Sequence, residues 1–137
     1  MTKLFIDSDI FLDVLLDRKE FVDQSSKIFD LSTINSFKLF TSSICISNTY
    51  YICSNLVGKE AARKNLNLIK PLFEICPSSN LAIEQALNSE FADLEDAFQY
   101  YTAVENSIDV IITRNIKDFK HSEIPVLNPT QYLATLI

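Results

Sequence analysis

The pattern of apolar and polar positions predicts short buried strands that alternate with helices. Leu4–Ile6 is an apolar run with the length of a strand buried on both faces, and a similar run, Asp109–Thr113, comes late in the chain. After the first run, apolar residues recur at helical spacing, at Ile10, Phe11, Val14 and Leu15. The first strand therefore leads at once into a helix, for which Asp9 is placed as the N-cap.

The rest of the chain repeats this alternation. We predict helices over residues 22–34, 44–57, 59–70 and 79–87, from Asp93 onward and from Pro129 onward, and short strands at 38–41, 72–76 and 125–127. The helix over 44–57 is apolar on nearly every side, so we expect it to be buried. We predict an α/β fold, a three-layer α/β/α sandwich on a central, mainly parallel sheet of about four to five strands. At 137 residues, we expect a single domain over residues 1–137.

The composition is that of an ordinary globular domain, with 47% apolar and 22% charged residues. No apolar run reaches the roughly 20 residues of a membrane span, and the N-terminus shows no signal-peptide pattern, so we expect a cytoplasmic protein and no membrane partner. The 3 cysteines lack metal-ligand spacing, so we expect them to be reduced. His121, the only histidine, leaves little material for a serine–histidine triad or a His-rich metal site.

The net charge of −6 by itself argues against a nucleic-acid partner, because phosphate binding depends on Lys and Arg. The charges are unevenly distributed, however. The segment from Pro71 to Thr113 has no Lys or Arg but is rich in Asp and Glu, and basic residues lie on both sides of it, at Lys59, Arg63, Lys64, Lys70, Arg114, Lys117 and Lys120. This pattern fits either a cation site with phosphate-binding rims or a mixed solvated surface.

Polar residues follow the two buried strands at their carboxyl ends, which share one edge in a parallel sheet. Asp7 follows the first strand, and Thr113, Asn115 and Asp118 lie on or after the second. Open α/β sheets bind their ligands at this edge. Mg²⁺ or Mn²⁺ prefers oxygen ligands and needs only one or two carboxylates plus water, so we expect a hard-cation site here.

Two further acids, Asp93 and Asp96, are three residues apart and therefore share one face of the first turn of a helix. They can complete the cation site with Asp7. They can equally serve as an N-cap and a capping-box partner, which the helix dipole favours in the same way.

Three other polar residues lie within predicted helices. Asn48 shares a helix face with apolar neighbours, so its amide is either a satisfied core group or a ligand through its oxygen. Asp13 and Asp17 follow Asp9 one and two turns later, where we expect a solvated acidic ridge.

The chain resembles the PIN domain family, in the bacterial branch that includes VapC-type toxins of toxin–antitoxin pairs. The resemblance rests on four segments that follow in order over nearly the whole chain: FIDSDIFLDVLLDR (5–18), TSSICISNTYYI (41–52), DLEDAFQYYTAVENSIDVIITRNIKDF (93–119) and IPVLNPTQYL (124–133). In that family four acids bind Mg²⁺ or Mn²⁺ and RNA phosphodiester bonds are hydrolysed. The resemblance implies that Asp7 is the first acid, Asp96 the third and Asp93 an auxiliary acid.

Two positions depart from the family pattern. Asn48 stands where a Glu is common, and Asn115 stands where an Asp is common. Each amide keeps an oxygen but loses a charge, so we expect one firmly held ion at most and weak or selective activity, with Asp118 as a compensating acid. The resemblance implies that Asp7 and Asp96 hold the metal and that Asp93 orients a water or acts as base.

The resemblance also implies roles for the polar and basic residues near these acids, and it implies partners. Asn48, Asn115 and Thr113 would position ligands or the phosphate, while Arg114 or Lys117 would hold the RNA backbone. An RNA substrate, a cognate antitoxin and a homodimer are implied.

Two alternatives remain. One is a PIN-like domain whose site has decayed and which binds RNA or protein. The other is a haloacid-dehalogenase-like phosphatase with Asp7 as nucleophile and Asp9 as general acid, although its glycine-containing acidic motif is poorly served by a chain whose only glycine is Gly58.

Overall fold

The centre of the molecule is a five-stranded parallel sheet with the strand order β3-β2-β1-β4-β5. The computed structural model describes residues 1–137. The strands are β1 Thr2–Ile6, β2 Phe37–Ser42, β3 Glu74–Cys76, β4 Val110–Ile112 and β5 Val126–Leu127. The predicted parallel sheet is therefore confirmed, with β1 in its middle.

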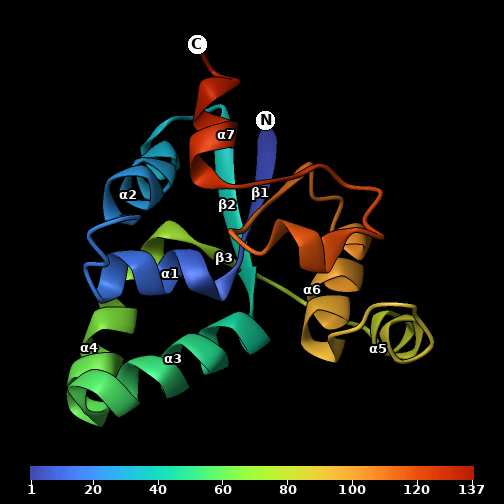
Figure 1. Ribbon diagram of the computed structural model, residues 1–137, viewed down its shortest axis with the longest axis horizontal. Coiled ribbons are helices and arrows are strands. Elements are labelled where there is room, and N and C mark those ends of the chain that lie inside the picture. The colour runs from blue at the N-terminus through green and yellow to red at the C-terminus, as the bar shows by residue number, and fades with distance from the viewer.

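Helices cover both faces of the sheet, as the alternating pattern predicted (Figure 1). The α-helices are α1 Ser8–Leu15, α2 Val22–Asp30, α3 Ser43–Val57, α4 Lys59–Ile69, α5 Asn80–Leu87, α6 Leu94–Glu105 and α7 Pro129–Ala134. Short 3₁₀ turns follow three of the elements, at η1 Leu31–Thr33, η2 Lys70–Leu72 and η3 Ile116–Phe119. Helices α1, α2, α4 and α7 lie on one side of the sheet, and α5 and α6 lie on the other (Figure 1). None of the helices has both the length and the apolar character needed to cross a bilayer.

The two faces of β1 contribute side chains to two separate hydrophobic cores, because successive side chains of a strand point to opposite sides. Leu4 and Ile6 pack with α1 and α2, and Phe5 packs with α6. On the first side, three phenylalanine rings meet edge to face or tilted, with centroids 4.6–5.6 Å apart: Phe11, Phe29 and Phe73. These rings pack α1 and α2 against each other and against the residue that leads into β3.

Two helix predictions need correction. The helix expected to be buried, α3, turns only Cys45, Thr49 and Cys53 fully inward, while Tyr51 is 66% exposed. The reason is that α3 packs along one stripe, against α1 and α4, rather than under a sheet. The helix predicted for 22–34 ends at Asp30, and η1 completes it.

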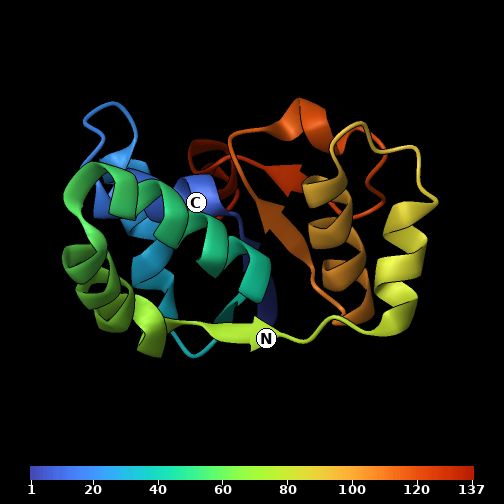
Figure 2. The same cartoon turned by 90° about the horizontal axis from the view of Figure 1, so that it is seen from below.

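The strand order places a topological switch point between β1 and β4. From β1 the chain moves outward through β2 and β3 on one side, and β4 and β5 lie on the other side. Loops therefore leave in opposite directions at the carboxyl ends of β1 and β4, and a crevice opens there in sheets of this kind. Figure 2 shows the molecule from the side where the carboxyl ends of the strands lie, with α3 on one flank and α6 on the other.

Candidate active site

Asp7 sits at the switch point because β1 ends at Ile6. Its backbone N–H still donates to the Ile112 carbonyl, at 3.1 Å, so it continues the ladder to β4 by one residue. Its backbone is extended, and its side chain accepts a 2.8 Å hydrogen bond from the Ser8 N–H. Asp7, and not the predicted Asp9, is thus the N-cap of α1, since Asp9 already lies inside the helix.

The side chain of Asp7 is held on both oxygens. Thr113, the residue after β4, donates from its hydroxyl to Oδ2 at 2.9 Å, and the Cys45 thiol lies 3.7 Å from Oδ1. Asp7, Cys45 and Thr113 are all buried. Burial raises the pKa of Asp7 above its usual value, although the hydrogen bonds from Ser8, Thr113 and Cys45 act in the opposite direction. A buried carboxylate with a raised pKa gains from a nearby cation.

The first turn of α6 brings the other acids. Asp93 is its N-cap, and one oxygen accepts from the N–H groups of Glu95, at 2.8 Å, and Asp96, at 3.2 Å. Burial raises the pKa of Asp96 to about 7, and the negative charges of Asp7, Asp93 and Asp118 add to this effect. The acids predicted from distant parts of the sequence therefore face a shared space.

Asn48 reaches the same space from α3. Its Nδ2 donates to the Ser8 hydroxyl and to Glu95 Oε1, each at 3.1 Å. Glu95 was not among the site residues predicted from the sequence, and its pKa is raised by burial and by the charges of Asp93 and Asp7. Glu95 thus brings a carboxylate to the position where Asn48 lacks one. The only feature of the sequence that could have indicated a role for Glu95 was its position near Asp93, in the first turn of a helix.

Asp9 also faces the end of β4. Its Oδ2 accepts a 2.9 Å hydrogen bond from the Arg114 backbone N–H, while its buried Oδ1 has no hydrogen-bond partner. Burial raises the pKa of Asp9 to about 7, with repulsion from Asp7 as the next cause. A buried carboxylate oxygen without a donor is costly, and a cation or a proton would relieve it.

The expected acidic ridge on α1 is wrong for Asp13, which is 0% exposed. Arg114 binds it with two hydrogen bonds, from Nε at 3.0 Å and Nη2 at 2.8 Å, and the Ser25 hydroxyl donates to it at 2.9 Å. The Arg114 guanidinium also lies over the Phe21 ring, 3.7 Å from its centroid. Asp17, in contrast, is exposed as expected.

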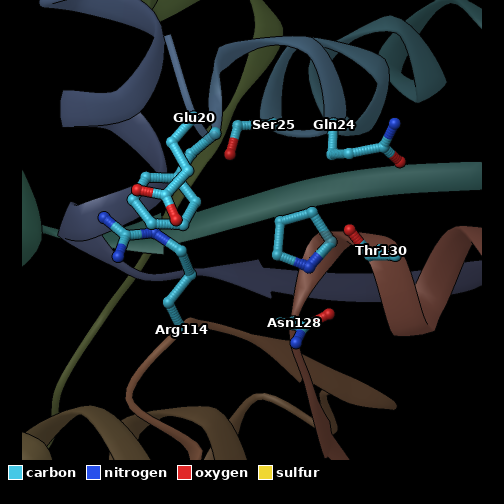
Figure 3. A pocket seen from close by; sticks show the side chains of 8 residues that line it. Glu20, Gln24, Ser25, Arg114, Asn128 and Thr130 are labelled. Atoms are coloured by element: carbon cyan, nitrogen blue, oxygen red, sulfur yellow. The ribbon is translucent and has the colours of Figure 1, made fainter. Parts of the chain in front are cut away.

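The Arg114 side chain borders a small polar pocket of about 110 Å³, where it points toward Glu20 (Figure 3). Because its guanidinium is bound to Asp13 on the α1–α2 side, it does not reach into the space shared by Asp7 and Asp96. Arg114 therefore contributes to the site through its backbone N–H, which fixes Asp9.

The loop after β4 forms the rim of the site. Asn115, Lys117 and Asp118 are exposed, and the Asn115 carbonyl accepts from the Asp118 N–H at 3.0 Å. Lys117 and Asp118 line a hollow of about 310 Å³ together with Asp93. The rim residues predicted from sequence thus lie next to the acids.

The donor set suits one hard cation better than a preformed multi-ligand centre. No group of three or more His, Cys, Asp and Glu side chains is arranged closely enough to hold a metal ion. Mg²⁺, however, needs only one or two carboxylates and keeps several waters. Asp7 and Asp96 would supply these oxygens, and a cation would offset the cost of burying their charges, which raises the pKa of both carboxyls.

A chain of buried polar side chains, which the sequence did not predict, lies behind Asp7. The Gln99 amide donates to Cys45 Sγ at 2.7 Å and accepts from the Ser42 hydroxyl. Gln99 follows Asp96 by three residues on α6, which is the spacing that could have placed it on the same face.

The structure thus defines an oxygen-rich site at the switch point of a parallel sheet. A family model described as PIN domain matches residues 3–117. The chain belongs to the PIN domain family. The family assignment removes the support for the phosphatase alternative, which rested on the FIDSD segment alone.

One curated relative and two solved structures show how far the similarity extends. The chain is 28% identical to Ribonuclease VapC1 of Aquifex aeolicus (strain VF5) over 135 residues, 95% of this chain and 92% of the relative. Its fold is similar to VapBC2 from Rickettsia felis bound to a promoter DNA fragment, with a TM-score of 0.72, 17% identity and coverage of 93% and 98% of the two chains. It is also similar to a toxin–antitoxin complex from Klebsiella pneumoniae, with a TM-score of 0.65, 23% identity and coverage of 92% and 97%.

Proposed function

We propose that this protein is a metal-dependent endoribonuclease and the toxin of a type II toxin–antitoxin pair. The observation that carries the proposal is the proximity of Asp7 and Asp96 at the switch point, where burial raises the pKa of both carboxyls and the charge of Asp7 raises that of Asp96 further. Similarity to Ribonuclease VapC1 over 95% of the chain supports an RNA substrate.

Asp7 and Asp96 would hold one Mg²⁺ or Mn²⁺ ion. When bound, the ion lowers the pKa of a water molecule and offsets the negative charge that develops on the scissile phosphate. The divalent metal is the general expectation for this family, and the choice between the two ions is part of the proposal.

The chain's own groups prepare this chemistry. Thr113 fixes the orientation of Asp7 through its 2.9 Å hydrogen bond. Asp93, at the N-cap of α6, would orient the attacking water or take its proton. Asn48 and Asn115 would position ligands or the phosphate, and Lys117 would bind the RNA backbone.

Glu95 and Asp118 would compensate for the two amides. Glu95 lies 3.1 Å from the Asn48 amide nitrogen, and the charge of Asp118 acts on Asp96. A net charge close to that of a four-acid site is thereby retained, although the carboxylates come from other positions.

We further propose an antitoxin protein as partner, a homodimer and a cytoplasmic location. The fold similarity to the Klebsiella pneumoniae toxin–antitoxin complex supports the partner. An apolar groove of about 410 Å³ between α3, α4 and β3, lined among others by Ile46, Tyr50, Leu66 and Ile75, offers an apolar segment of that antitoxin a place to dock.

A second candidate is a domain that binds RNA or protein without cleaving it. The specific observation in its favour is that the neutral amides Asn48 and Asn115 stand at the rim where acids would strengthen metal binding. This candidate predicts no metal-dependent turnover.

One experiment separates the two candidates. Calorimetric titration with Mn²⁺ and Mg²⁺, and RNA cleavage on the same samples, would compare the wild type with Asp7→Asn/Asp96→Asn. The matched control is Asp23→Asn/Asp30→Asn, which removes two exposed charges on α2. Loss of binding and cleavage in the first double variant, but not in the control, supports the nuclease. A wild type that binds no metal supports the binding domain.

A further inference from the structure

A hollow lined by aromatic rings lies beside the candidate site, on the face of the molecule that carries α5 and α6. It measures about 510 Å³, within the range of small-ligand sites. Its rings come from three places in the sequence: the loop between α5 and α6, α6 itself and the segment after η3. We call it the aromatic hollow, and its rings are Phe91, Tyr100, Tyr101 and His121.

The rings of the aromatic hollow are held in place by one another. Phe91 is at their centre, with its centroid 5.2 Å from Tyr100, 6.2 Å from Tyr101 and 5.8 Å from His121. The Tyr100 hydroxyl accepts a 3.1 Å hydrogen bond from the Glu123 N–H, which ties the back wall to the segment after η3. Tyr101 is only half-buried and His121 is exposed, so both can contact a ligand.

A second hollow connects the aromatic hollow to the acids. It is the hollow of about 310 Å³ on the rim, which Asp93, Lys117, Asp118, Lys120 and His121 line. His121 lines both hollows, so the two lie next to each other. A chain molecule that leaves the acids past Asp93 would meet the two lysines and then the rings.

Lys117 and Lys120 form no ion pair within the protein. Beyond Lys70 the basic residues of the chain are Arg114, Lys117 and Lys120, and Arg114 is bound to Asp13. Lys117 and Lys120 are exposed and make no ion pair, although the chain has a net charge of −6. Unpaired cations next to a carboxylate cluster are placed to bind a polyanion whose phosphates the acids alone would repel.

We propose that these hollows form a binding track for single-stranded RNA, with the phosphates on Lys117 and Lys120 and one unpaired base stacked in the aromatic hollow. The inference rests on the proposed ribonuclease function and adds a substrate-binding subsite to it. Stacking on aromatic side chains is a common way for proteins to hold unpaired bases, and cationic grooves follow the backbone.

The polar lining of the aromatic hollow suits a base better than an apolar peptide segment. Gln85 and Asn88 bring amides that can donate to and accept from base edges, and Glu90 and Glu123 bring carboxylates that can only accept when ionised. Bases with an amino group therefore fit better than uracil, which has none.

The test measures RNA binding and cleavage separately. Binding would be followed by fluorescence anisotropy of a short, labelled single-stranded RNA of mixed sequence, in an Asp7→Asn background that prevents cleavage. The ring variant is Tyr101→Leu/His121→Ala, and its matched control is Tyr51→Leu on α3. The lysine variant is Lys117→Gln/Lys120→Gln, and its matched control is Lys59→Gln/Lys64→Gln on α4. Thermal unfolding of each variant checks that it is folded.

We expect the ring variant to weaken binding by about tenfold or more, as for the loss of one stacked base, with an unchanged salt dependence. The lysine variant should also bind more weakly, and the slope of log K against log salt should fall by about 1.4, the value for two lost phosphate contacts on a single strand. In RNAs that carry 2-aminopurine, the fluorescence change on stacking should persist in the lysine variant at saturation and disappear in the ring variant.

The outcomes distinguish this subsite from the function on which it rests. If the wild-type site cleaves RNA and the ring variant binds and cleaves like the Tyr51→Leu control, the subsite is wrong and the nuclease stands. If the wild-type chain cleaves nothing but the ring variant still loses RNA binding, the nuclease is wrong and the track belongs to a binding domain. A chain that binds no RNA at all overturns both.

Discussion

The Thr113 hydroxyl donates a 2.9 Å hydrogen bond to Oδ2 of Asp7, although 106 residues separate the two in sequence. The parallel register explains their meeting, because Ile6 pairs with Ile112 and each of the two residues directly follows its strand. The same hydroxyl oxygen accepts a 3.1 Å hydrogen bond from the Asn115 N–H. Thr113 therefore links the first acid of the site to the loop that forms its rim.

Replacing Thr113 with Val should harm both stability and cleavage. The methyl group fits the buried position, but Asp7 Oδ2 and the Asn115 N–H each lose a partner, which costs about 1–3 kcal/mol of unfolding free energy. Urea unfolding measures this cost, and RNA cleavage by the folded variant should fall. Thr113→Ser keeps the hydroxyl and should recover most of the activity. Equal cleavage by the Val and Ser variants would show that the hydroxyl does not position Asp7.

The metal-free protein should become less stable as the pH rises. The pKa of Asp9 is about 7 in the folded chain, against 3.8 for the free group, so the folded state binds more protons between these values. The contribution of Asp9 to the unfolding free energy is therefore fully present below about pH 4 and is lost as the pH rises through about 7. The shift corresponds to at most about 4 kcal/mol, and we expect about 1–2 kcal/mol after the side chain relaxes.

Asp9→Asn tests this pH dependence directly. The amide oxygen can still accept from the Arg114 N–H, and the charge is gone. The variant should be more stable than the wild type at pH 8 in EDTA, and the difference should vanish near pH 4. Denaturant unfolding at both pH values measures it, with Asp30→Asn as an exposed control. A variant that is less stable at pH 8 would mean that the Asp9 carboxylate stabilises the fold in its charged form.

Much of the frame of the site could be predicted from the sequence, because it depends on local patterns. Apolar runs located β1 and β4, and the parallel sheet then brought Asp7 and Thr113 to one edge. The first turn of α6 placed Asp93 and Asp96 on one face. These features follow from strand period, helix period and capping, which a sequence displays directly.

The rest depends on distances between elements, which no local pattern gives. Asp13 looks like a surface residue of an amphipathic helix, but the loop after β4 delivers Arg114 to it, 101 residues away. Glu95 lies at the candidate site because α3 brings Asn48 within 3.1 Å of it. The exposure of α3 has the same origin, since only one stripe of that helix meets other elements.

Arg114→Lys should destabilise the protein more than it lowers the intrinsic activity. The ammonium group cannot reproduce the two hydrogen bonds to Asp13, and leaving a buried carboxylate poorly paired costs about 3 kcal/mol. Arg18, whose Nη1 lies 3.6 Å from Asp13, can offset part of this loss. Urea unfolding and single-turnover RNA cleavage below the unfolding transition would be compared. A large loss of cleavage at wild-type stability would place the guanidinium on the RNA instead.

The two amides at the rim provide the last prediction. Asn115 is exposed, so Asn115→Asp should add a charge next to the site at little cost in stability and should strengthen Mn²⁺ binding several-fold. Asn48→Glu should behave differently, because the new carboxylate would face Glu95, whose Oε1 now accepts a 3.1 Å hydrogen bond from the amide. That variant should lose about 1–3 kcal/mol without metal and recover stability when Mn²⁺ is added, since the ion offsets the repulsion.

Calorimetric titration with Mn²⁺ and thermal unfolding with and without the ion measure both effects, with Asn67→Asp on the exposed side of α4 as the control. RNA cleavage should rise with metal affinity from the wild type to Asn115→Asp, and further to the double variant Asn48→Glu/Asn115→Asp. If both variants bind Mn²⁺ more tightly and still cleave no RNA, metal occupancy is not what limits the site. The domain would then be better described as one that binds RNA without cleaving it.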